Sequence, residues 1–397
     1  MPWPLRIITY ATILVVIILF YFGFRYFRCA ARLKLQPRWL VRSLYFIPAA
    51  LFLAYPAAGH FQFWFKGSFS RAEFPDPVIY LFWYGVVCMG VMLNWLILHD
   101  LLRALFVYFS KNNPHKLKNR FAKIFLITVA LTVPYTAAKI IWDTHRITLE
   151  EITYTTPVGK SLSATLTIVH IADLHADPFT GNEKMRRYID KVNEQNPDIV
   201  IFAGDLITSG RDHIEAGAEA LSWIESTYGV WFVMGDHDYW SETDVIAEAL
   251  IEREVNVLQN QNAWIEHGET LIKITGVTEL YSSRINAGLL DQLLLEDRGE
   301  TLRILASHQA SDRLIAEGRR TGVHQLLAGH THGGQIRIPL FFYPVTAARA
   351  ETPYVNGNWQ MGEMLLNVNN GLGFTLAPVR YNAPAQVSVI TVTEASN

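Results

Sequence analysis

Aspartate and histidine recur directly after short apolar runs in the C-terminal part of this 397-residue chain. The stretch GVWFVMGDHDYW, residues 229–240, is one example. Its apolar run ends at Gly235 and is followed by Asp236, His237 and Asp238. A single polar cluster after a strand is more often a turn or a helix cap than a set of ligands. The pattern becomes informative because four other apolar runs end in the same way.

The five runs are predicted to be strands of one α/β domain. They are TLTIVHIADLH (165–175), DIVIFAGD (198–205), GVWFVMGD (229–236), LRILASH (302–308) and HQLLAGHTH (324–332). Each contains four to six apolar residues, as expected of a strand covered on both faces. Helical candidates lie between them at Lys184–Asn196, Ile214–Ser226 and Thr243–Glu254. In such domains the carboxyl ends of the strands build the functional site.

The strand ends offer carboxylate oxygens and imidazole nitrogens as their candidate ligands. The residues concerned are Asp173, His175, Asp205, Asp236, His237, His308, His330 and His332. These donors suit Mn, Fe, Zn, Co or Mg rather than a metal selected by thiolates. They are too many for one tetrahedral ion, so the sequence predicts two divalent metal ions that share a carboxylate.

Glycines and cysteines are consistent with this interpretation. Glycines flank the candidate ligands and allow sharp backbone turns there; they are Gly204, Gly235, Gly329, Gly333 and Gly334. The segment AGHTHGGQ also suggests a phosphate-binding glycine loop, but neither GxxxxGK[ST] nor GxGxxG spacing is present. Both cysteines, Cys29 and Cys88, lie far from the candidate ligands in the sequence.

The N-terminal part has the composition of a membrane region. Half of the chain is hydrophobic and only 18% is charged. About 20 apolar residues are needed to cross a bilayer, and four runs qualify: Ile7–Phe24, Leu44–Phe65, Val78–Leu98 and Phe121–Trp142. We therefore predict a transmembrane region over residues 1–145 and one soluble domain over residues 146–397. The net charge of −2 gives no indication of nucleic-acid binding.

Loop charges predict the orientation of the protein in the cell (inner) membrane. Loop 25–43 contains six basic residues and loop 99–120 contains five, whereas loop 66–77 contains two, balanced by two acids. Basic loops remain in the cytoplasm, so the C-terminal domain is expected on the extracytoplasmic side. The second span contains Pro48, Pro56 and His60, and its loss would invert this orientation.

The complete motif order, ADLHAD, AGDLI, MGDHD, ASHQ and AGHTHGGQ, resembles the calcineurin-like metallophosphoesterase superfamily from about residue 165 to 393. The tail VNNGLGFTLAPVRYNAPAQVSVITV is most similar to the membrane-associated branch, which includes YaeI-type phosphodiesterases and UDP-2,3-diacylglucosamine hydrolases. The resemblance implies a four-layer αββα sandwich with two mixed sheets between layers of helices.

The resemblance also implies a role for each candidate ligand. Asp173, His175 and His332 would hold the first metal ion, and Asp236, His308 and His330 the second. Asp205 and a nucleophilic hydroxide would bridge both ions, while His237 would donate a hydrogen bond or proton to the leaving oxygen. The chain departs from the family at Asp236, where asparagine is usual. An ionised carboxylate there is expected to tighten metal binding.

These features lead to one principal functional hypothesis and two alternatives. The first is a membrane-anchored phosphoesterase, with manganese among its candidate metals, that acts on phosphodiester or pyrophosphate bonds, including those of a lipid-linked substrate. A cytoplasmic domain would instead favour a UDP-2,3-diacylglucosamine-type pyrophosphate hydrolase. A non-catalytic membrane sensor or binding module is the third hypothesis.

Overall fold

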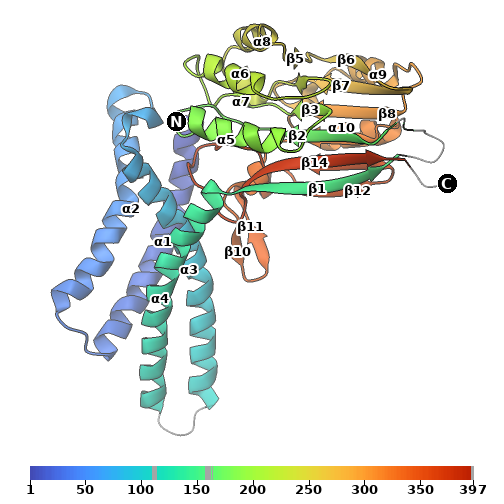
Figure 1. The fold of residues 1–397 in the computed structure, drawn as a ribbon. Helices are drawn as coiled ribbons and strands as arrows, with labels where there is room; N and C mark the ends of the chain where they lie inside the picture. The colour runs from blue at the N-terminus through green and yellow to red at the C-terminus, as the bar shows by residue number, and fades with distance from the viewer. Residues whose placement is uncertain (110–113, 157–161, 163, 395–397) are drawn as a thin grey trace. The chain divides into compact units, whose positions relative to one another are not determined.

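The computed structural model describes residues 1–109, 114–156, 162 and 164–394 (Figure 1). The chain forms two compact units. The helical unit comprises residues 1–144, 336–345 and 376–382, and the sheet unit comprises residues 145–335, 346–375 and 383–397. The main division follows Thr144. Two short segments that are distant in sequence nevertheless belong to the helical unit.

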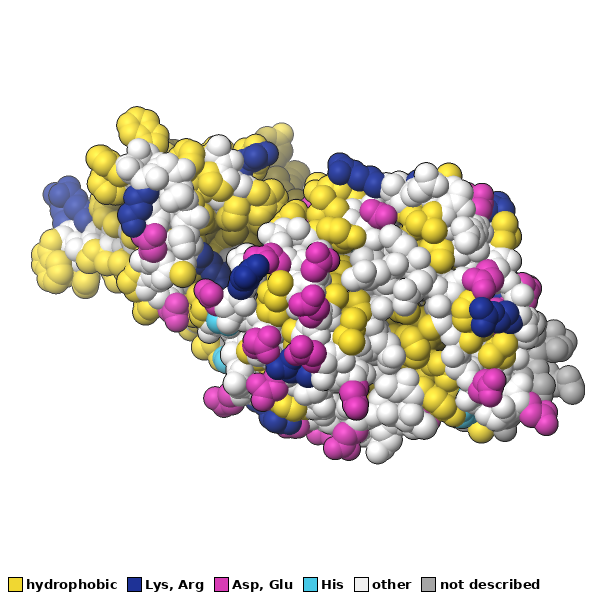
Figure 2. All heavy atoms as spheres, turned by 90° about the horizontal axis from the view of Figure 1, so that it is seen from above, with side chains coloured by type: hydrophobic (Ala, Val, Ile, Leu, Met, Phe, Trp, Pro, Cys, Tyr) yellow, Lys and Arg dark blue, Asp and Glu magenta, His cyan; other side chains and the backbone are white. Residues whose placement is uncertain are grey.

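The helical unit contains four long apolar helices, as the sequence predicts. They are α1 (Trp3–Arg32), α2 (Arg38–Lys66), α3 (Asp76–Phe109) and α4 (Pro114–His145). Each is long and apolar enough to cross a membrane. Helix α2 continues through Pro48 and Pro56. Apolar side chains cover much of the visible surface of this unit (Figure 2), and Trp64 and Phe20 are among its most exposed hydrophobic residues.

The two late segments of the helical unit are held by specific contacts with its helices. Strands β10 (Ile338–Leu340) and β11 (Tyr343–Val345) form an antiparallel hairpin. The backbone N–H of Phe341 donates to Asn94 of α3 at 2.7 Å. In the second segment, the backbone N–H of Asn382 donates to Asp143 of α4 at 2.6 Å. A 3₁₀ turn, η1 (Arg71–Glu73), lies between α2 and α3.

The sheet unit is built on two six-stranded mixed sheets. The first has the order β1 (Ile147–Thr155), β14 (Ala385–Thr393), β2 (Leu166–Ile171), β3 (Ile199–Phe202), β4 (Val230–Phe232) and β5 (Asn256–Val257). The second has the order β12 (Gly357–Met361), β13 (Met364–Val368), β9 (Gln325–Ala328), β8 (Leu302–Ser307), β7 (Thr270–Val277) and β6 (Gln261–His267). Strands β2, β3 and β4 are parallel neighbours, as are β7, β8 and β9.

Helices cover the outer faces of both sheets. Those associated with the first sheet are α5 (Asn182–Asn193), α6 (Ile214–Ser222) and α8 (Thr243–Ile251), and those with the second are α9 (Ala287–Leu295) and α10 (Asp312–Arg320). Shorter helical elements are α7 (Asp236–Tyr239), η2 (Ser282–Arg284), η3 (His332–Gly334) and η4 (Ala347–Ala350). The three predicted helices are present, although each ends three or four residues earlier than expected.

Alternating side chains of the strands form separate apolar cores, which explains the uninterrupted hydrophobic runs. Ile168 of β2 belongs to the core between the sheets, together with Ile274 of β7. The next residue, Val169, belongs to the core beneath the first layer of helices. A third core joins the second sheet to α9 and α10. The predicted four-layer αββα architecture is therefore confirmed.

Candidate metal centre

The predicted ligands follow the carboxyl ends of five strands from the two sheets. Asp173 and His175 follow β2, Asp205 follows β3, and Asp236 begins helix α7 after β4. His308 follows β8, while His330 and His332 follow β9. Because β2, β3 and β4 run parallel, their carboxyl ends meet at one edge of the first sheet. The ends of β8 and β9 meet in the same way in the second sheet.

Seven of these residues form two groups in which the potential ligand atoms lie within 4.8 Å of one another. The first group is Asp173, His175, Asp205 and His332, and the second is Asp236, His308 and His330. Six of the seven residues are buried, and His330 is partly exposed. Buried polar groups at this density require compensating partners.

The distances show how closely the first group converges. The Nε2 atoms of His175 and His332 are 3.0 Å apart. The Oδ2 atom of Asp205 lies 3.3 Å from Nε2 of His175 and also 3.3 Å from Nε2 of His308 in the second group. Asp205 therefore lies between the two groups, which is the position required of a shared ligand.

The second group is centred on Asp236. Its Oδ1 atom lies 2.9 Å from Nε2 of His308 and 3.1 Å from Nδ1 of His330. Those two imidazole nitrogens are 3.3 Å apart. Two nitrogens and a carboxylate oxygen thus face a common point, as they do around a divalent cation.

Hydrogen bonds from His308 and His330 to groups outside the cluster determine which imidazole nitrogen is free to face this point. Nδ1 of His308 lies 2.7 Å from the carbonyl oxygen of Ala203, which can only accept, so Nδ1 carries the proton. Nε2 of His330 lies 3.0 Å from the carboxylate of Glu351 and donates to it. In the neutral form of each ring, the lone pair is therefore on the nitrogen that faces Asp236. This arrangement of a ligand imidazole and an outer acceptor is typical of metal centres.

The backbone at the ligands is strained. Five of the seven have a positive φ, a conformation that costs a residue with a side chain about 1–3 kcal/mol; they are Asp173, His175, Asp205, His330 and His332. Gly204 also has a positive φ of 87°. Gly235 serves a different purpose, because an added Cβ there would lie 2.1 Å from Oδ1 of Asp205. Strain concentrated at one cluster indicates a functional site.

Asp238 holds two ligand loops together. Its Oδ2 atom accepts from the backbone N–H groups of Gly235 and Asp205, and its Oδ1 atom accepts from that of Leu206, each at 2.9 Å. The side chain is fully buried. Its position as the third residue of α7 is the position of the acid in a capping box. That spacing is a signal in the sequence that our interpretation of GDHD does not use.

His237 lies beside the ligands and has a different environment. Its backbone N–H donates to Oδ1 of Asp205 at 2.9 Å, and its Nδ1 lies 2.6 Å from the carbonyl oxygen of Thr208. Nδ1 therefore carries a proton. The ring is 4.6 Å from that of His175, measured between centroids. His237 is thus adjacent to the first group but belongs to neither group.

Burial and mutual attraction shift the pKa values of the ligands in opposite directions. Burial raises the pKa of Asp173 to about 7. Burial acts to lower the pKa of His330, but hydrogen bonds to Asp236 and Glu351 outweigh it and raise the pKa to about 9. Without a cation, protons held on His308 and His330 offset part of the carboxylate charge. A divalent cation supplies the same positive charge, so the residues present fit a metal centre.

The structure thus brings together all eight predicted site residues, while the remaining histidines of the sheet unit lie in other environments. His267 is hydrogen-bonded to Tyr228, and Nδ1 of His324 accepts from the backbone N–H of Arg303 at 3.0 Å. Sequence reasoning missed Asp238 and Glu351. No motif identifies Glu351, because it approaches His330 only through the fold.

Comparison with known proteins identifies the class of this domain. Residues 166–334 match the family described as calcineurin-like phosphoesterase. The sheet unit therefore contains a calcineurin-like metallophosphoesterase domain. The match includes all eight predicted site residues and nearly all of the motif order on which the resemblance was based.

Three relatives show how far the similarity extends. A Danio rerio transmembrane protein with a metallophosphoesterase domain is 28% identical over 240 residues, which cover 58% of this chain and 54% of that protein. The metallophosphoesterase YkuE of Bacillus subtilis is 28% identical, with 57% and 78% covered. The phosphodiesterase YaeI of Escherichia coli is 26% identical, with 58% and 83% covered. The chain thus spans about half the length of the Danio rerio relative.

Proposed function

We propose that this protein is a membrane-anchored, dinuclear-metal phosphoesterase that hydrolyses phosphodiester or pyrophosphate bonds. The observation that carries the proposal is the convergence of seven oxygen and nitrogen donors in two groups. Two divalent ions in these groups would activate water as a nucleophile and withdraw charge from the phosphoryl oxygens. The relatives named as phosphoesterases support the same reaction class.

The geometry supports one metal ion in each group of residues. Asp173, His175 and His332 would hold one ion. Asp236, His308 and His330 would hold the other. Asp205 would be shared, since its Oδ2 atom is equally distant from His175 and His308. The identity of the metals is left open among Mn, Fe, Zn, Co and Mg, because all accept these donors.

His237 would act as the proton donor to the leaving oxygen. Its Nδ1 proton is engaged by the carbonyl of Thr208, which fixes the orientation of the ring and leaves Nε2 for proton transfer. The ring is only partly buried, unlike those of His175 and His308. An imidazole that is oriented but not used as a ligand suits general acid catalysis.

A lipid-linked phosphate ester at the membrane surface is the substrate class that we favour. Four residues after His332 the chain enters the helical unit, at residue 336. It returns to the sheet unit at residue 346, five residues before Glu351, which contacts His330. The loop that carries two ligands is therefore continuous with the apolar helical unit. A site attached in this way would meet substrates that are held in the membrane.

The orientation that we propose is extracytoplasmic for the sheet unit. Its support is the charge of loops 25–43 and 99–120, which contain eleven basic residues between them. After four crossings, the end of α4 lies on the side opposite these loops. The substrate would then be exposed on the outer side of the inner membrane.

Substitutions of the adjacent residues Asp236 and His237 test the mechanism, because they should impair metal binding and turnover in different ways. Asp236→Ala removes a ligand, so metal content should fall and part of the activity should return at high metal concentration. Asp236→Asn should remain substantially active, because its amide oxygen can still coordinate. His237→Ala should retain its metal but lose roughly 10²–10⁴-fold in turnover, as expected for a positioned acid.

Leaving-group dependence and a matched control complete the test. The defect of His237→Ala should shrink with a nitrophenyl ester, whose leaving group needs little protonation, and be largest with an alkyl ester. His213→Ala, at a partly buried histidine that precedes α6, should match the wild type throughout. Full turnover of alkyl esters by His237→Ala would contradict its role as the acid. Unchanged metal content in Asp236→Ala would contradict the metal assignment.

A further inference from the structure

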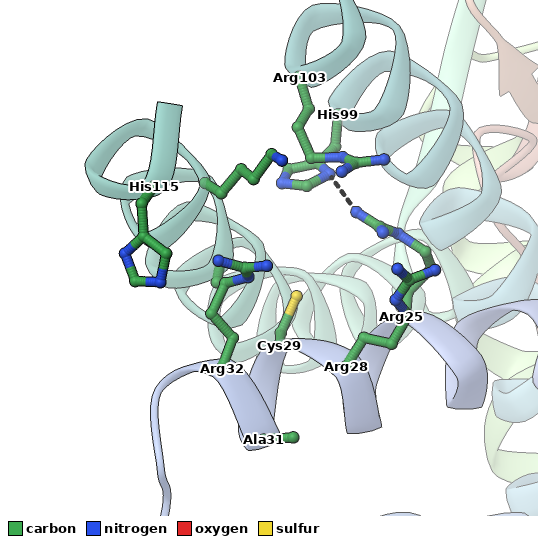
Figure 3. A pocket seen from close by; sticks show the side chains of 10 residues that line it. Arg25, Arg28, Cys29, Ala31, Arg32, His99, Arg103 and His115 are labelled. Atoms are coloured by element: carbon green, nitrogen blue, oxygen red, sulfur yellow. Dashed lines mark hydrogen bonds between the residues drawn. The ribbon is translucent and has the colours of Figure 1, made fainter. Parts of the chain in front are cut away.

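The helical unit contains a pocket of about 380 Å³ lined by basic side chains, at the ends of helices adjacent to the two basic loops (Figure 3). Helix α1 contributes three arginines, α3 one, and α4 a lysine and a histidine. These residues are Arg25, Arg28, Arg32, Arg103, Lys118 and His115. In Figure 3 the labelled arginines and histidines surround a common opening. Three helices that are separate in sequence therefore direct positive charge into one space.

The positive charge of this basic pocket is only partly neutralised. Asp100 pairs with Arg25 at 2.6 Å and lies 3.7 Å from Arg103. Arg28 lies over the ring of Phe24, and Arg32 donates to Asn119 at 3.4 Å. Within the described residues, no carboxylate forms an ion pair with Arg28, Arg32 or Lys118. The pocket thus retains at least three cations without an acidic partner, which is the electrostatic requirement for binding an anion.

A second, apolar cavity of about 430 Å³ shares His99 with the basic pocket. It lies between α3 and α4 and is lined mainly by Leu98, Leu102, Phe106, Phe121 and Ile124. Several of these side chains are exposed, including Phe106 and Ile124 at 55% and 50%. Because α3 and α4 are membrane-spanning candidates, this exposed apolar surface is available to acyl chains. A water-soluble phosphate compound has no acyl chain to contact this surface.

We propose that the basic pocket and the adjoining apolar cavity form one binding site for an anionic phospholipid. The phosphate would lie among Arg28, Arg32 and Lys118, and an acyl chain would lie along the α3–α4 cavity. Guanidinium groups bind phosphate through paired, charge-assisted hydrogen bonds. Basic pockets between membrane helices provide both the charge and the apolar contact that such a lipid needs.

This lipid site is distinct from the metal centre. The basic pocket includes residues in the first turns of α4, whereas the sheet unit begins at His145, the last residue of α4. At 1.5 Å per residue, the 29 residue steps of helix from His115 to Thr144 span roughly 43 Å. The lipid site and the metal centre share no residue. The lipid-site proposal does not depend on the proposed phosphoesterase activity.

The test compares lipid retention by the full-length protein and by two charge-matched variants. Phosphatidylglycerol and phosphatidylcholine with the same acyl chains are titrated into the detergent-purified protein, and bound lipid is counted by native mass spectrometry. Arg28→Gln/Arg32→Gln removes two pocket cations. Arg38→Gln/Arg42→Gln removes two exposed cations of α2, in the same basic loop region. Thermal unfolding of all three proteins verifies that each is folded.

The wild type should retain phosphatidylglycerol in preference to phosphatidylcholine. At about fivefold per cation near an anionic headgroup, the pocket variant should bind phosphatidylglycerol roughly 25-fold more weakly. The α2 variant should bind it as the wild type does. Glycerol phosphate, which lacks acyl chains, should fail to compete. Equal losses in the two variants, equal retention of both lipids by the wild type, or full competition by glycerol phosphate would each overturn the proposal.

Discussion

Replacing Asp238 with asparagine should disturb the metal centre even though Asp238 is not a predicted ligand. Its two carboxylate oxygens accept three backbone N–H groups, from Gly235, Asp205 and Leu206. An amide offers only one accepting oxygen. The best orientation retains the two bonds to Gly235 and Asp205 and places an NH₂ group against the N–H of Leu206. The substitution therefore loses one hydrogen bond and opposes two donors in a buried position.

The cost of this change can be estimated from the contacts. One buried donor left without an acceptor costs about 1–3 kcal/mol. Asp238→Ala would leave three such donors, roughly 3–9 kcal/mol, which is comparable with the stability of a whole domain. Asp238→Asn is therefore the informative variant, because it should fold. Loosening an outer hydrogen-bond partner typically lowers metal affinity 10–100-fold.

The assay combines thermal unfolding, metal content and hydrolysis of a nitrophenyl phosphodiester. Asp238→Asn should unfold at a lower temperature, bind metal 10–100-fold more weakly, and recover activity when metal is added in excess. Asp244→Asn, an exposed acid in the first turn of α8, serves as the control and should change little. If Asp238→Asn has wild-type stability and metal affinity, the three hydrogen bonds do not position the ligand loops, and this reasoning is wrong.

Three further predictions test other parts of the molecule. Chelation should abolish hydrolysis, and Mn, Co, Fe or Zn should restore some of it. Full activity in metal-stripped protein would refute the mechanism. Metal binding at pH 7 should also release protons, because the pKa of His330 is raised to about 9 without metal. Calorimetry in buffers of different ionisation enthalpy would detect this release. Burial lowers the pKa of His170 from 6.5 to about 4, so the unfolded chain binds a proton between these values that the folded chain does not. The free energy of unfolding should therefore fall as pH drops from 6.5 to 4, by up to about 3 kcal/mol at 1.36 kcal/mol per pKa unit. Unfolding measured at several pH values should show that His170→Gln loses this contribution to the pH dependence. Reporters active only in the cytoplasm should be active when fused at residue 40 and silent when fused at residue 145; the reverse result would place the sheet unit inside the cell and favour a cytoplasmic nucleotide-lipid pyrophosphate as substrate.

The ligand set could be predicted from the sequence because a metal centre constrains residue types strongly. Only a few side chains donate oxygen or nitrogen to divalent metals, and an α/β sheet gathers its strand ends at one edge. Asp173, Asp205 and His308 could therefore be identified from their positions after apolar runs. The four apolar helices were also predictable, because the length and composition of a membrane span are local properties.

Other features were decided only by the tertiary structure. The proton positions on His308 and His330 depend on Ala203 and Glu351, which are separated from them by 105 and 21 residues. The grouping of residues 336–345 with the helices depends on contacts such as that between Phe341 and Asn94. The basic pocket likewise combines α1, α3 and α4. Such contacts join residues that are far apart in the sequence, and no local sequence pattern predicts them. They follow from the way whole helices and strands pack together.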